Sequence, residues 1–113
     1  MTNLKLITSC LFVFLMLSCS SDDTIVNNPP IEFSITFGRV DNNGLLPITW
    51  TEAIDPDGDT VTYNVFADDV LKESNLKERK ATIALINTKN IKITVVAKDS
   101  KGAETEVVKI YRD

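Results

Sequence analysis

The chain has 113 residues, which is enough for one small domain. It carries 12 basic and 16 acidic residues and no histidine, so its formal net charge is −4 at pH 7. The acidic balance argues against a nucleic-acid partner, and the lack of histidine removes the commonest general base near neutral pH, so we expect neither an enzyme nor a nucleic-acid-binding protein.

Residues 1–18 have the pattern of a secretory signal peptide. Residues 1–5 carry one positive charge, residues 6–17 are almost wholly apolar, and small and polar residues follow. The apolar run is shorter than the roughly 20 residues that a membrane-spanning helix needs. We expect this segment to be cleaved on export, which leaves a mature chain with a net charge of −5, because Lys5 is the only charged residue of the segment.

Residues 15–19, LMLSC, resemble the lipobox of bacterial lipoproteins, where signal peptidase II cleaves before a cysteine that carries acyl chains. Leu17 and Ser18 match the motif well, and Met16 stands where leucine is usual. The resemblance implies that Cys19 is the lipidated first residue of the mature protein, carrying chains such as palmitate, at the outer membrane. Two or more acyl chains anchor a protein stably, at about 0.8 kcal/mol per buried CH₂. The alternatives are an ordinary secretory signal and an uncleaved membrane anchor.

Residues 19–30 have the composition of a flexible linker behind the lipid. The stretch is polar and ends in Pro29 and Pro30, which favour extended polyproline geometry. Its start, CSSDD, resembles the acidic signal that directs some Gram-negative lipoproteins to the cell surface. An acidic solvated linker without that role is the alternative, so the side of the outer membrane that the protein faces stays open.

Alternating apolar and polar residues predict β-strands from residue 31 onward. The predicted inward residues are Ile31, Phe33, Ile35 and Phe37, then Leu46, Ile48 and Trp50, then Val61, Tyr63, Val65 and Ala67, then Ile83 and Leu85, then Ile91, Ile93, Val95 and Ala97, and finally Val108 and Ile110. Pro47 lacks a donor for the ladder, so it predicts an interruption or an edge near the start of its strand. Residues 68–80 are rich in charge, and we expect a short edge strand near residues 70–72, with a helical turn as the alternative.

Turn signals separate these strands. Residues 41–44 end in Asn-Gly, a strong hairpin-turn signal. Residues 55–58, DPDG, suit a type I turn, and residues 99–102 repeat its pattern of Asp first and Gly fourth. The patterns predict about seven short strands and no helix. We therefore expect residues 31–113 to form one all-β domain, a seven-stranded antiparallel sandwich. Its core must hold without a disulfide, because no cysteine follows position 19.

Residues 45–113 resemble a fibronectin type III-like domain of the kind found in bacterial secreted proteins. Trp50 stands where that family has a core tryptophan, and YNVF at residues 63–66 resembles its third-strand pattern. Residues 85–103 resemble the passage from its fifth to its sixth strand and the turn that follows. Ile91 departs from the family, which usually has tyrosine there, so a neighbouring immunoglobulin-like or cadherin-like sandwich is the alternative. The resemblance implies a scaffold used for spacing, adhesion and binding, and no catalytic activity.

Asp55, Asp57 and Asp59 form the most suggestive polar cluster in the sequence. Three carboxylates at alternate positions suit a hard cation with oxygen ligands, such as Ca²⁺. The residues that would complete the shell, if the fold brings them near, are Asp68, Asp69 or Asp99. We favour the other interpretation, a solvated turn in which Asp, Pro and Gly serve backbone geometry. We accordingly expect no cofactor, with Ca²⁺ as the alternative.

Aromatic residues supply a second candidate site. Trp50 and Tyr63 fall at inward positions, so we expect them in the core rather than on a sugar-stacking surface. Phe66 and Tyr111 fall opposite the predicted inward residues of their strands. If both are exposed and adjacent, they form a binding patch.

These features together predict a non-enzymatic, lipid-anchored protein of the cell envelope. Its domain would serve surface adhesion or interaction, or act as an accessory to glycan handling, and its contact with the membrane would be the N-terminal lipid. The protein or glycan partner is not given by the sequence. The alternatives are a periplasm-facing lipoprotein that binds or inhibits an envelope enzyme, and a Ca²⁺-binding sandwich module.

Overall fold

The computed structural model describes residues 26–85 and 90–113. These residues form seven strands and no helix, as the sequence patterns predict. The strands are β2 (Ile35–Phe37), β3 (Leu45–Trp50), β4 (Val61–Ala67), β5 (Val70–Leu76), β6 (Lys80–Ala84), β7 (Asn90–Asp99) and β8 (Glu104–Arg112). The predicted signal peptide and Cys19 lie outside the described residues.

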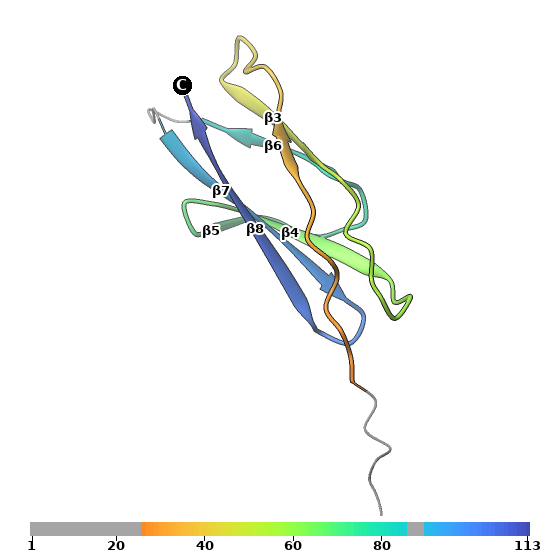
Figure 1. The fold of residues 1–113 in the computed structure, drawn as a ribbon. Helices are drawn as coiled ribbons and strands as arrows, with labels where there is room; N and C mark the ends of the chain where they lie inside the picture. The colour runs from red at the N-terminus through yellow and green to blue at the C-terminus, as the bar shows by residue number, and fades with distance from the viewer. Residues whose placement is uncertain (1–25, 86–89) are drawn as a thin grey trace, which may run out of the picture.

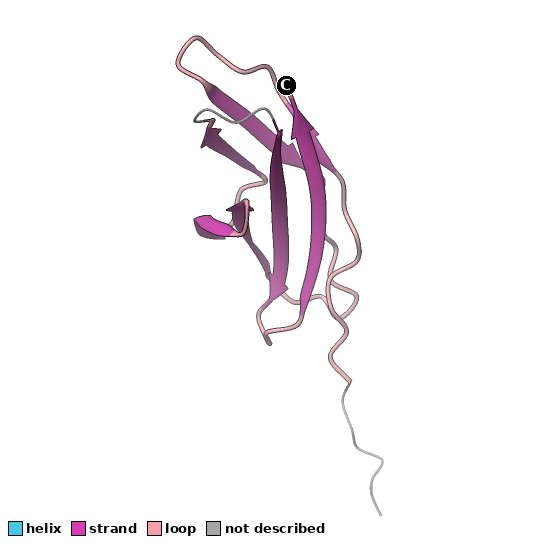
Figure 2. Ribbon diagram, turned by 90° about the vertical axis from the view of Figure 1, so that its left-hand side faces the viewer, coloured by secondary structure: helices cyan, strands magenta, loops and turns pink. Residues whose placement is uncertain are grey.

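The strands make two antiparallel sheets (Figure 1). One sheet has the order β2-β3-β6, and the other has the order β5-β4-β7-β8. Consecutive strands pair as hairpins in β2–β3, β4–β5 and β7–β8, and the remaining connections cross from one sheet to the other. The loops gather at the two ends of the fold (Figure 2). The prediction of an all-β, antiparallel domain is confirmed.

One hydrophobic core joins the inward faces of the two sheets. The predicted alternation holds in the three strands β3, β4 and β7. Their buried apolar residues are Leu46, Ile48, Trp50, Tyr63, Val65, Ala67, Ile91, Ile93, Val95 and Ala97. Trp50 is only 4% exposed and meets the Tyr63 ring edge-on, with 5.5 Å between the ring centres. Trp50 and Tyr63 are therefore core residues, as expected.

Three turns repeat one hydrogen-bonding pattern. Gly44, Gly58 and Gly102 each donate their backbone N–H to the carbonyl oxygen of the aspartate three residues earlier, at 3.0, 3.0 and 3.1 Å. Each glycine has a positive φ, of 76°, 76° and 95°, which costs a residue without Cβ little. The aspartate carboxylates in turn accept the N–H groups two and four residues later. The turns expected at residues 41–44, from Asn-Gly, and at residues 55–58 and 99–102, from Asp first and Gly fourth, are all present.

Strands β2 and β5 differ in length from their predictions. Ile31 lies outside β2, where its N–H donates to the Ile54 carbonyl oxygen at 2.8 Å. Its side chain is 48% exposed, so the prediction that Ile31 points inward is wrong. Phe33 and Ile35 are buried as predicted. The predicted edge strand near residues 70–72 exists and extends further, to Leu76.

Pro47 occupies the one stretch of β3 that tolerates it. β3 is the central strand of its sheet, but β2 pairs only with Ile48, Thr49 and Trp50. Along Leu45–Pro47, β3 therefore has a ladder partner on the β6 side alone. The Pro47 carbonyl accepts from Gly38 at 2.8 Å, so its missing donor faces the side where regular pairing has ended. The expected edge near the start of this strand is confirmed.

In strand β8, the face that packs against the core is the opposite of the predicted one. Val107 and Tyr111 pack against the core, whereas Val108 and Ile110 are 45% and 37% exposed. The register explains the difference, because β8 places Val107 directly opposite the buried Val95 of β7. Residues directly opposite each other in an antiparallel pair share one face of the sheet. The prediction that Val108 and Ile110 point inward is wrong.

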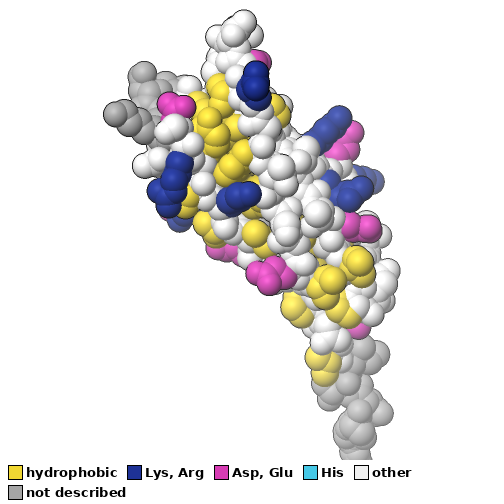
Figure 3. Space-filling model, turned by 45° about the horizontal axis from the view of Figure 1, so that its top comes forward, with side chains coloured by type: hydrophobic (Ala, Val, Ile, Leu, Met, Phe, Trp, Pro, Cys, Tyr) yellow, Lys and Arg dark blue, Asp and Glu magenta, His cyan; other side chains and the backbone are white. Residues whose placement is uncertain are grey.

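Lys109 and Tyr111 of β8 contact β2 where the two sheets meet along their edges. The Lys109 ammonium donates to the Ile35 carbonyl oxygen at 2.9 Å and lies 5.3 Å from the centre of the Phe37 ring. Tyr111 meets the same ring edge-on, with 5.4 Å between ring centres. Figure 3 shows apolar side chains gathered in the upper part of the face in view, with basic side chains beside them.

Candidate functional site

Three segments that are far apart in the sequence converge at one end of the fold. They are the N-terminal residues 26–30, the β3–β4 loop at residues 55–59, and the β7–β8 turn at residues 99–103, all at the lower end of Figure 1. The pairing of Val61 with Asp99 brings the start of β4 beside the end of β7 and so joins the second and third segments. We call these three segments the acidic loop end.

The carboxylates of Asp55, Asp59 and Asp99 cluster at the acidic loop end. One oxygen from each lies within 4.8 Å of the others. Asp55 is 7% exposed and Asp99 is 3% exposed, and the Asp59 side chain is largely covered as well. Three carboxylates held so close in a place shielded from water repel one another, because Coulomb interactions strengthen where the local dielectric constant falls.

Each of the three carboxylates has a different set of hydrogen-bond partners. Oδ2 of Asp55 accepts the N–H groups of Asp57 and Asp59, at 3.0 and 2.9 Å. Oδ1 of Asp59 pairs with the Lys101 ammonium at 2.8 Å. Oδ2 of Asp99 accepts from the side-chain amide of Asn27 at 2.9 Å. Oδ1 of Asp55 and Oδ2 of Asp59 are buried and have no hydrogen-bond partner within the described part of the chain.

Asp57 does not belong to the cluster, which corrects the predicted set of Asp55, Asp57 and Asp59. Its Oδ2 accepts the backbone N–H of Asn28 at 2.7 Å, and its Oδ1 lies 3.4 Å from the side-chain amide nitrogen of the same residue. Alternate positions suggest a common face only in a regular strand, whereas a turn lies between these aspartates. The structure brings together Asp55 and Asp59, and it adds Asp99 to them.

Asp68 and Asp69, the other candidates for completing a metal shell, lie at the opposite end of β4. Oδ1 of Asp68 accepts the Lys92 N–H at 2.9 Å, and Asp69 pairs with the Lys92 ammonium at 2.8 Å. Asn27 and Lys101 are site residues that sequence reasoning missed. In the sequence, these two residues are marked only by lying in a predicted linker and a predicted turn. That position does not show which loop their side chains would contact.

Hydrogen bonds and ion pairs shift two pKa values at the acidic loop end. Burial acts to raise the pKa of Asp99, but hydrogen bonds from the Ala103 N–H, the Asn27 side chain and the Lys101 N–H outweigh it, and the pKa lies below its ordinary value. The pKa of Lys101 is raised by its hydrogen bond and charge interaction with Asp59. Asp99 therefore stays ionised at neutral pH although it is buried.

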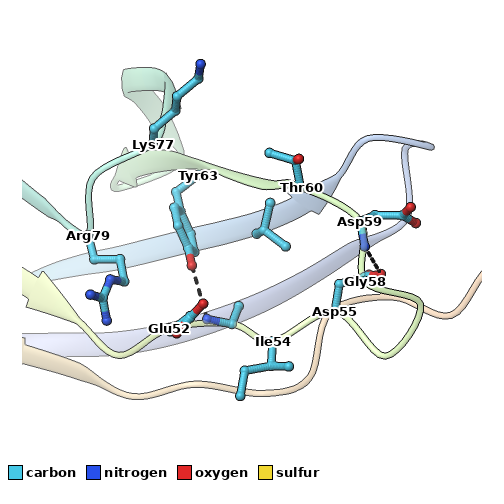
Figure 4. Close-up of a pocket in the computed structure, with 11 residues that line it drawn as sticks. Glu52, Ile54, Asp55, Gly58, Asp59, Thr60, Tyr63, Lys77 and Arg79 are labelled. Carbon is cyan, nitrogen blue, oxygen red and sulfur yellow. Dashed lines mark hydrogen bonds between the residues drawn. The ribbon is translucent and has the colours of Figure 1, made fainter.

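A hollow of about 360 Å³ adjoins the acidic loop end. Figure 4 shows Asp55 and Asp59 at one side of it, Lys77 and Arg79 at the other, and Tyr63 between them. The Tyr63 hydroxyl accepts the Ala53 N–H at 3.1 Å. Among the described residues that line the hollow, no nucleophile is hydrogen-bonded to a base. What the hollow offers is charge and hydrogen bonding.

A second surface lies on the outer face of the four-stranded sheet. Phe66 pairs across β4, β5 and β7 with Leu71 and Thr94, and Thr94 pairs with Val108 of β8. With Val96 and Ile110 these residues form a cross-strand strip, which we call the outer-sheet surface. Leu71, Val108 and Ile110 are exposed on it and Phe66 is half-buried, whereas Thr94 and Val96 are buried in its middle. Asp69, Glu104 and Glu106 line a hollow of about 280 Å³ on it.

The predicted patch of Phe66 and Tyr111 does not form. Phe66 is part of the outer-sheet surface, whereas Tyr111 lies on the inward face of β8, against Phe37. The two rings therefore lie on opposite faces of the same sheet. The prediction failed because it placed Val108 and Ile110, rather than Val107 and Tyr111, on the inward face of β8.

Comparisons with known proteins add no relative. A scan against protein-family models, a search of curated proteins and a search of solved structures each found no significant match to this chain. Within residues 26–85 and 90–113, no helix has the length and apolar character needed to cross a bilayer.

Proposed function

We propose that the protein is a non-enzymatic, lipid-anchored interaction module of the cell envelope, held at the outer membrane by acyl chains on Cys19. The signal-like residues 1–18, the lipobox-like residues 15–19 and the polar linker support this proposal. The described domain fits a binding role because its interior is filled by packed side chains. A filled sandwich of this kind presents its faces and loops, rather than a deep cleft, to other molecules.

We assign the domain to the fibronectin type III-like sandwiches as part of the same proposal. A three-stranded sheet packs against a four-stranded one, and the core tryptophan of the resemblance, Trp50, is buried in β3. Ile91, which replaces the usual tyrosine, is also buried, so packing holds this position without a hydroxyl. The assignment implies a scaffold and leaves the binding specificity to the exposed residues.

The outer-sheet surface is the observation that carries the binding role. Leu71 is 51% exposed and Val108 is 45% exposed, although both lie in one cross-strand row with Phe66 and Thr94. Exposed apolar residues on one sheet face, rimmed by charges, are typical of protein interaction sites. Their aliphatic character favours a protein partner over a sugar, since Phe66 is the only ring in this strip. Asp69, Glu104 and Glu106 line the hollow on this surface and Lys92 pairs with Asp69, so the rim offers charges of both signs to that partner.

The anchoring part of the proposal is tested by following the acyl chains. Cells that produce the chain are fed an alkyne analogue of palmitate, and the N-terminal peptide is analysed by mass spectrometry. We expect label on Cys19 and protein in the outer-membrane fraction. Cys19→Ser should abolish both, whereas Cys10→Ser, at the only other cysteine, should change neither. An unmodified Cys19 on cytosolic protein would refute the anchoring.

The orientation is tested by adding protease to intact cells. Loss of the domain supports a surface-facing module. Protection until the outer membrane is opened supports the alternative, a periplasm-facing lipoprotein that binds or inhibits an envelope enzyme. Both results are compatible with lipidation at Cys19, so this experiment and the labelling experiment can fail independently.

A further inference from the structure

We propose that Asp55, Asp59, Asp99 and the side-chain oxygen of Asn27 bind one Ca²⁺ ion, and that the ion holds residues 26–30 against the acidic loop end. The ligands come from three separate segments of the chain. The inference rests on the geometry of the described residues alone and is independent of lipidation or of the partner of the outer-sheet surface.

The spacing of the carboxylates matches a single ion. Ca²⁺ takes six to eight oxygen ligands at about 2.3–2.6 Å, so two oxygens on opposite sides of it lie about 4.6–5.2 Å apart. One oxygen each from Asp55, Asp59 and Asp99 lies within 4.8 Å of the others. All three can therefore contact one ion with little movement.

Unpartnered oxygens supply the second line of evidence. Oδ1 of Asp55, Oδ2 of Asp59 and Oδ1 of Asn27 are buried and have no hydrogen-bond partner in residues 26–85 and 90–113. Leaving a buried acceptor without a partner costs free energy, and such atoms are rare in native structures. Asp55 is more than nine-tenths buried, so its free oxygen is well shielded from bulk solvent.

The bonds that do exist leave the free oxygens available to a ligand. In Asp55, Oδ2 accepts the backbone N–H groups of Asp57 and Asp59, and Oδ1 has no partner among the described residues. In Asp59 the Lys101 ammonium goes to Oδ1 and leaves Oδ2 free. Asn27 is neutral and comes from a different segment, yet its amide nitrogen binds Asp99 and its oxygen is free as well.

Charge and ligand type favour Ca²⁺ among the common ions. Three carboxylates and the Lys101 ammonium carry a net charge of −2, which one divalent cation neutralises. The donor set is all oxygen, which suits Ca²⁺ and Mg²⁺ and does not suit the softer metals that prefer imidazole or thiolate. Mg²⁺ demands near-ideal octahedral geometry at about 2.0–2.1 Å and gives up its waters reluctantly. Ligands fixed by turns in three segments fit the more flexible shell of Ca²⁺.

The ion would strengthen an attachment that is already present. The N-terminal segment is tied to the loops by Asn27 on Asp99, by the Asn28 N–H on Asp57, and by the Thr105 hydroxyl on the Pro30 carbonyl. An ion that also takes Oδ1 of Asn27 adds a stronger link between that segment and both loops. Ca²⁺ would then limit how the domain turns on its linker.

The test is a titration of the full chain in non-ionic detergent, first stripped with a chelator. Calorimetry should give one Ca²⁺ site with a dissociation constant of about 10⁻⁴ to 10⁻³ M, the range of extracellular modules. At ten times that concentration the melting temperature should rise by about 5–10 °C. No heat and no thermal shift with Ca²⁺ would overturn the proposal, as would an equal response to Mg²⁺.

Two matched variants separate the site from general charge. Asp59→Asn keeps an oxygen for Lys101 and should weaken Ca²⁺ binding at least tenfold while the apo protein still melts cooperatively. Asp57→Asn removes the same charge two residues away, from a carboxylate that faces Asn28, and should bind within about threefold of the wild type. Equal losses in the two variants would contradict the assigned ligands.

The role of Asn27 has its own readout. In the wild type, Ca²⁺ should slow protease cleavage within residues 20–30, and in Asn27→Ala this protection should be lost while the melting shift is only reduced. If Ca²⁺ shifts the melting temperature but leaves the cleavage rate of the wild type unchanged, the ion binds without holding the segment, and that half of the proposal is wrong.

Discussion

At the scale of single residues, one local motif has two different outcomes. Asp41, Asp55 and Asp99 all cap an Asp-to-Gly turn with the same pattern of backbone bonds. Asp41 is exposed and serves the turn alone. Asp55 and Asp99 are buried next to each other, because β4 pairs with β7. The turn chemistry is local, whereas the candidate site depends on which turns the sheet brings together.

The buried carboxylate of Asp99 predicts a pH dependence of stability. Its pKa in the folded protein lies below the ordinary value of about 3.9, because hydrogen bonds to the charged form outweigh the cost of burial. The unfolded chain therefore takes up a proton first as the pH falls. The stabilising contribution of Asp99 is fully present above about pH 4 and is lost as the pH falls through the folded pKa.

Urea unfolding in chelator between pH 6 and pH 2.5 measures this contribution. Asp99→Asn should unfold at lower urea than the wild type at pH 6, and the difference between the two proteins should shrink towards pH 2.5. Carboxylates outside the acidic loop end titrate in both proteins, so their effect cancels, and the difference reports Asp99 together with its coupling to Asp55 and Asp59. A difference that stays constant with pH would mean that Asp99 acts through shape rather than charge.

At the scale of the strand, local alternation predicts the central strands well and one edge strand badly. β4 and β7 each carry a buried apolar residue at every second position of their inward face, although the middle of β7 is buried on both faces. In β8 both faces carry apolar residues, and the inward row contains Lys109, so alternation favours the wrong face. The face is decided by pairing with β7, which is not visible in the local pattern.

The candidate site was predictable to a similar degree. The three turns and the carboxylates of Asp55 and Asp59 follow from composition. The exclusion of Asp57 and the arrival of Asp99 depend on the loop path and on strand pairing, which connect residues about forty positions apart. Asn27 lies in a stretch whose composition predicts only a linker. Local rules therefore found the motif and missed its partners.

The register of β8 is tested by two neighbouring valines. Val107→Ala removes methyl groups that pack against the core and should lower the free energy of unfolding by about 1 kcal/mol. Val108→Ala makes the same change on the exposed face and should stay within about 0.5 kcal/mol of the wild type. Both lose the same intrinsic strand preference, so the difference reports burial. A larger loss in Val108→Ala would restore the face predicted from the sequence.

At the scale of the whole molecule, the two ends of the fold have different surroundings under the proposed anchoring. The N-terminal segment leaves at the acidic loop end, and the C-terminus lies at the opposite end (Figure 1). Only residues 20–25 separate Cys19 from the segment attached to the loops, and six residues span at most about 20 Å. Under that anchoring, the acidic loop end is the end nearer the membrane. The strands of the outer-sheet surface run away from it, so a partner approaches that surface from the side.

This arrangement predicts where a partner touches the domain in the cell. A photo-reactive amino acid in place of Val108 lies within the outer-sheet surface, whereas one in place of Thr49 lies on the exposed outer face of β3 in the other sheet. Both positions are exposed strand positions, so both should be tolerated by the fold. Illumination of intact cells should give one discrete protein adduct from position 108 and none from position 49. The same adducts from both positions would mean that collisions at the membrane, rather than the apolar strip, determine contact, and adducts from position 49 alone would move the binding face to the three-stranded sheet.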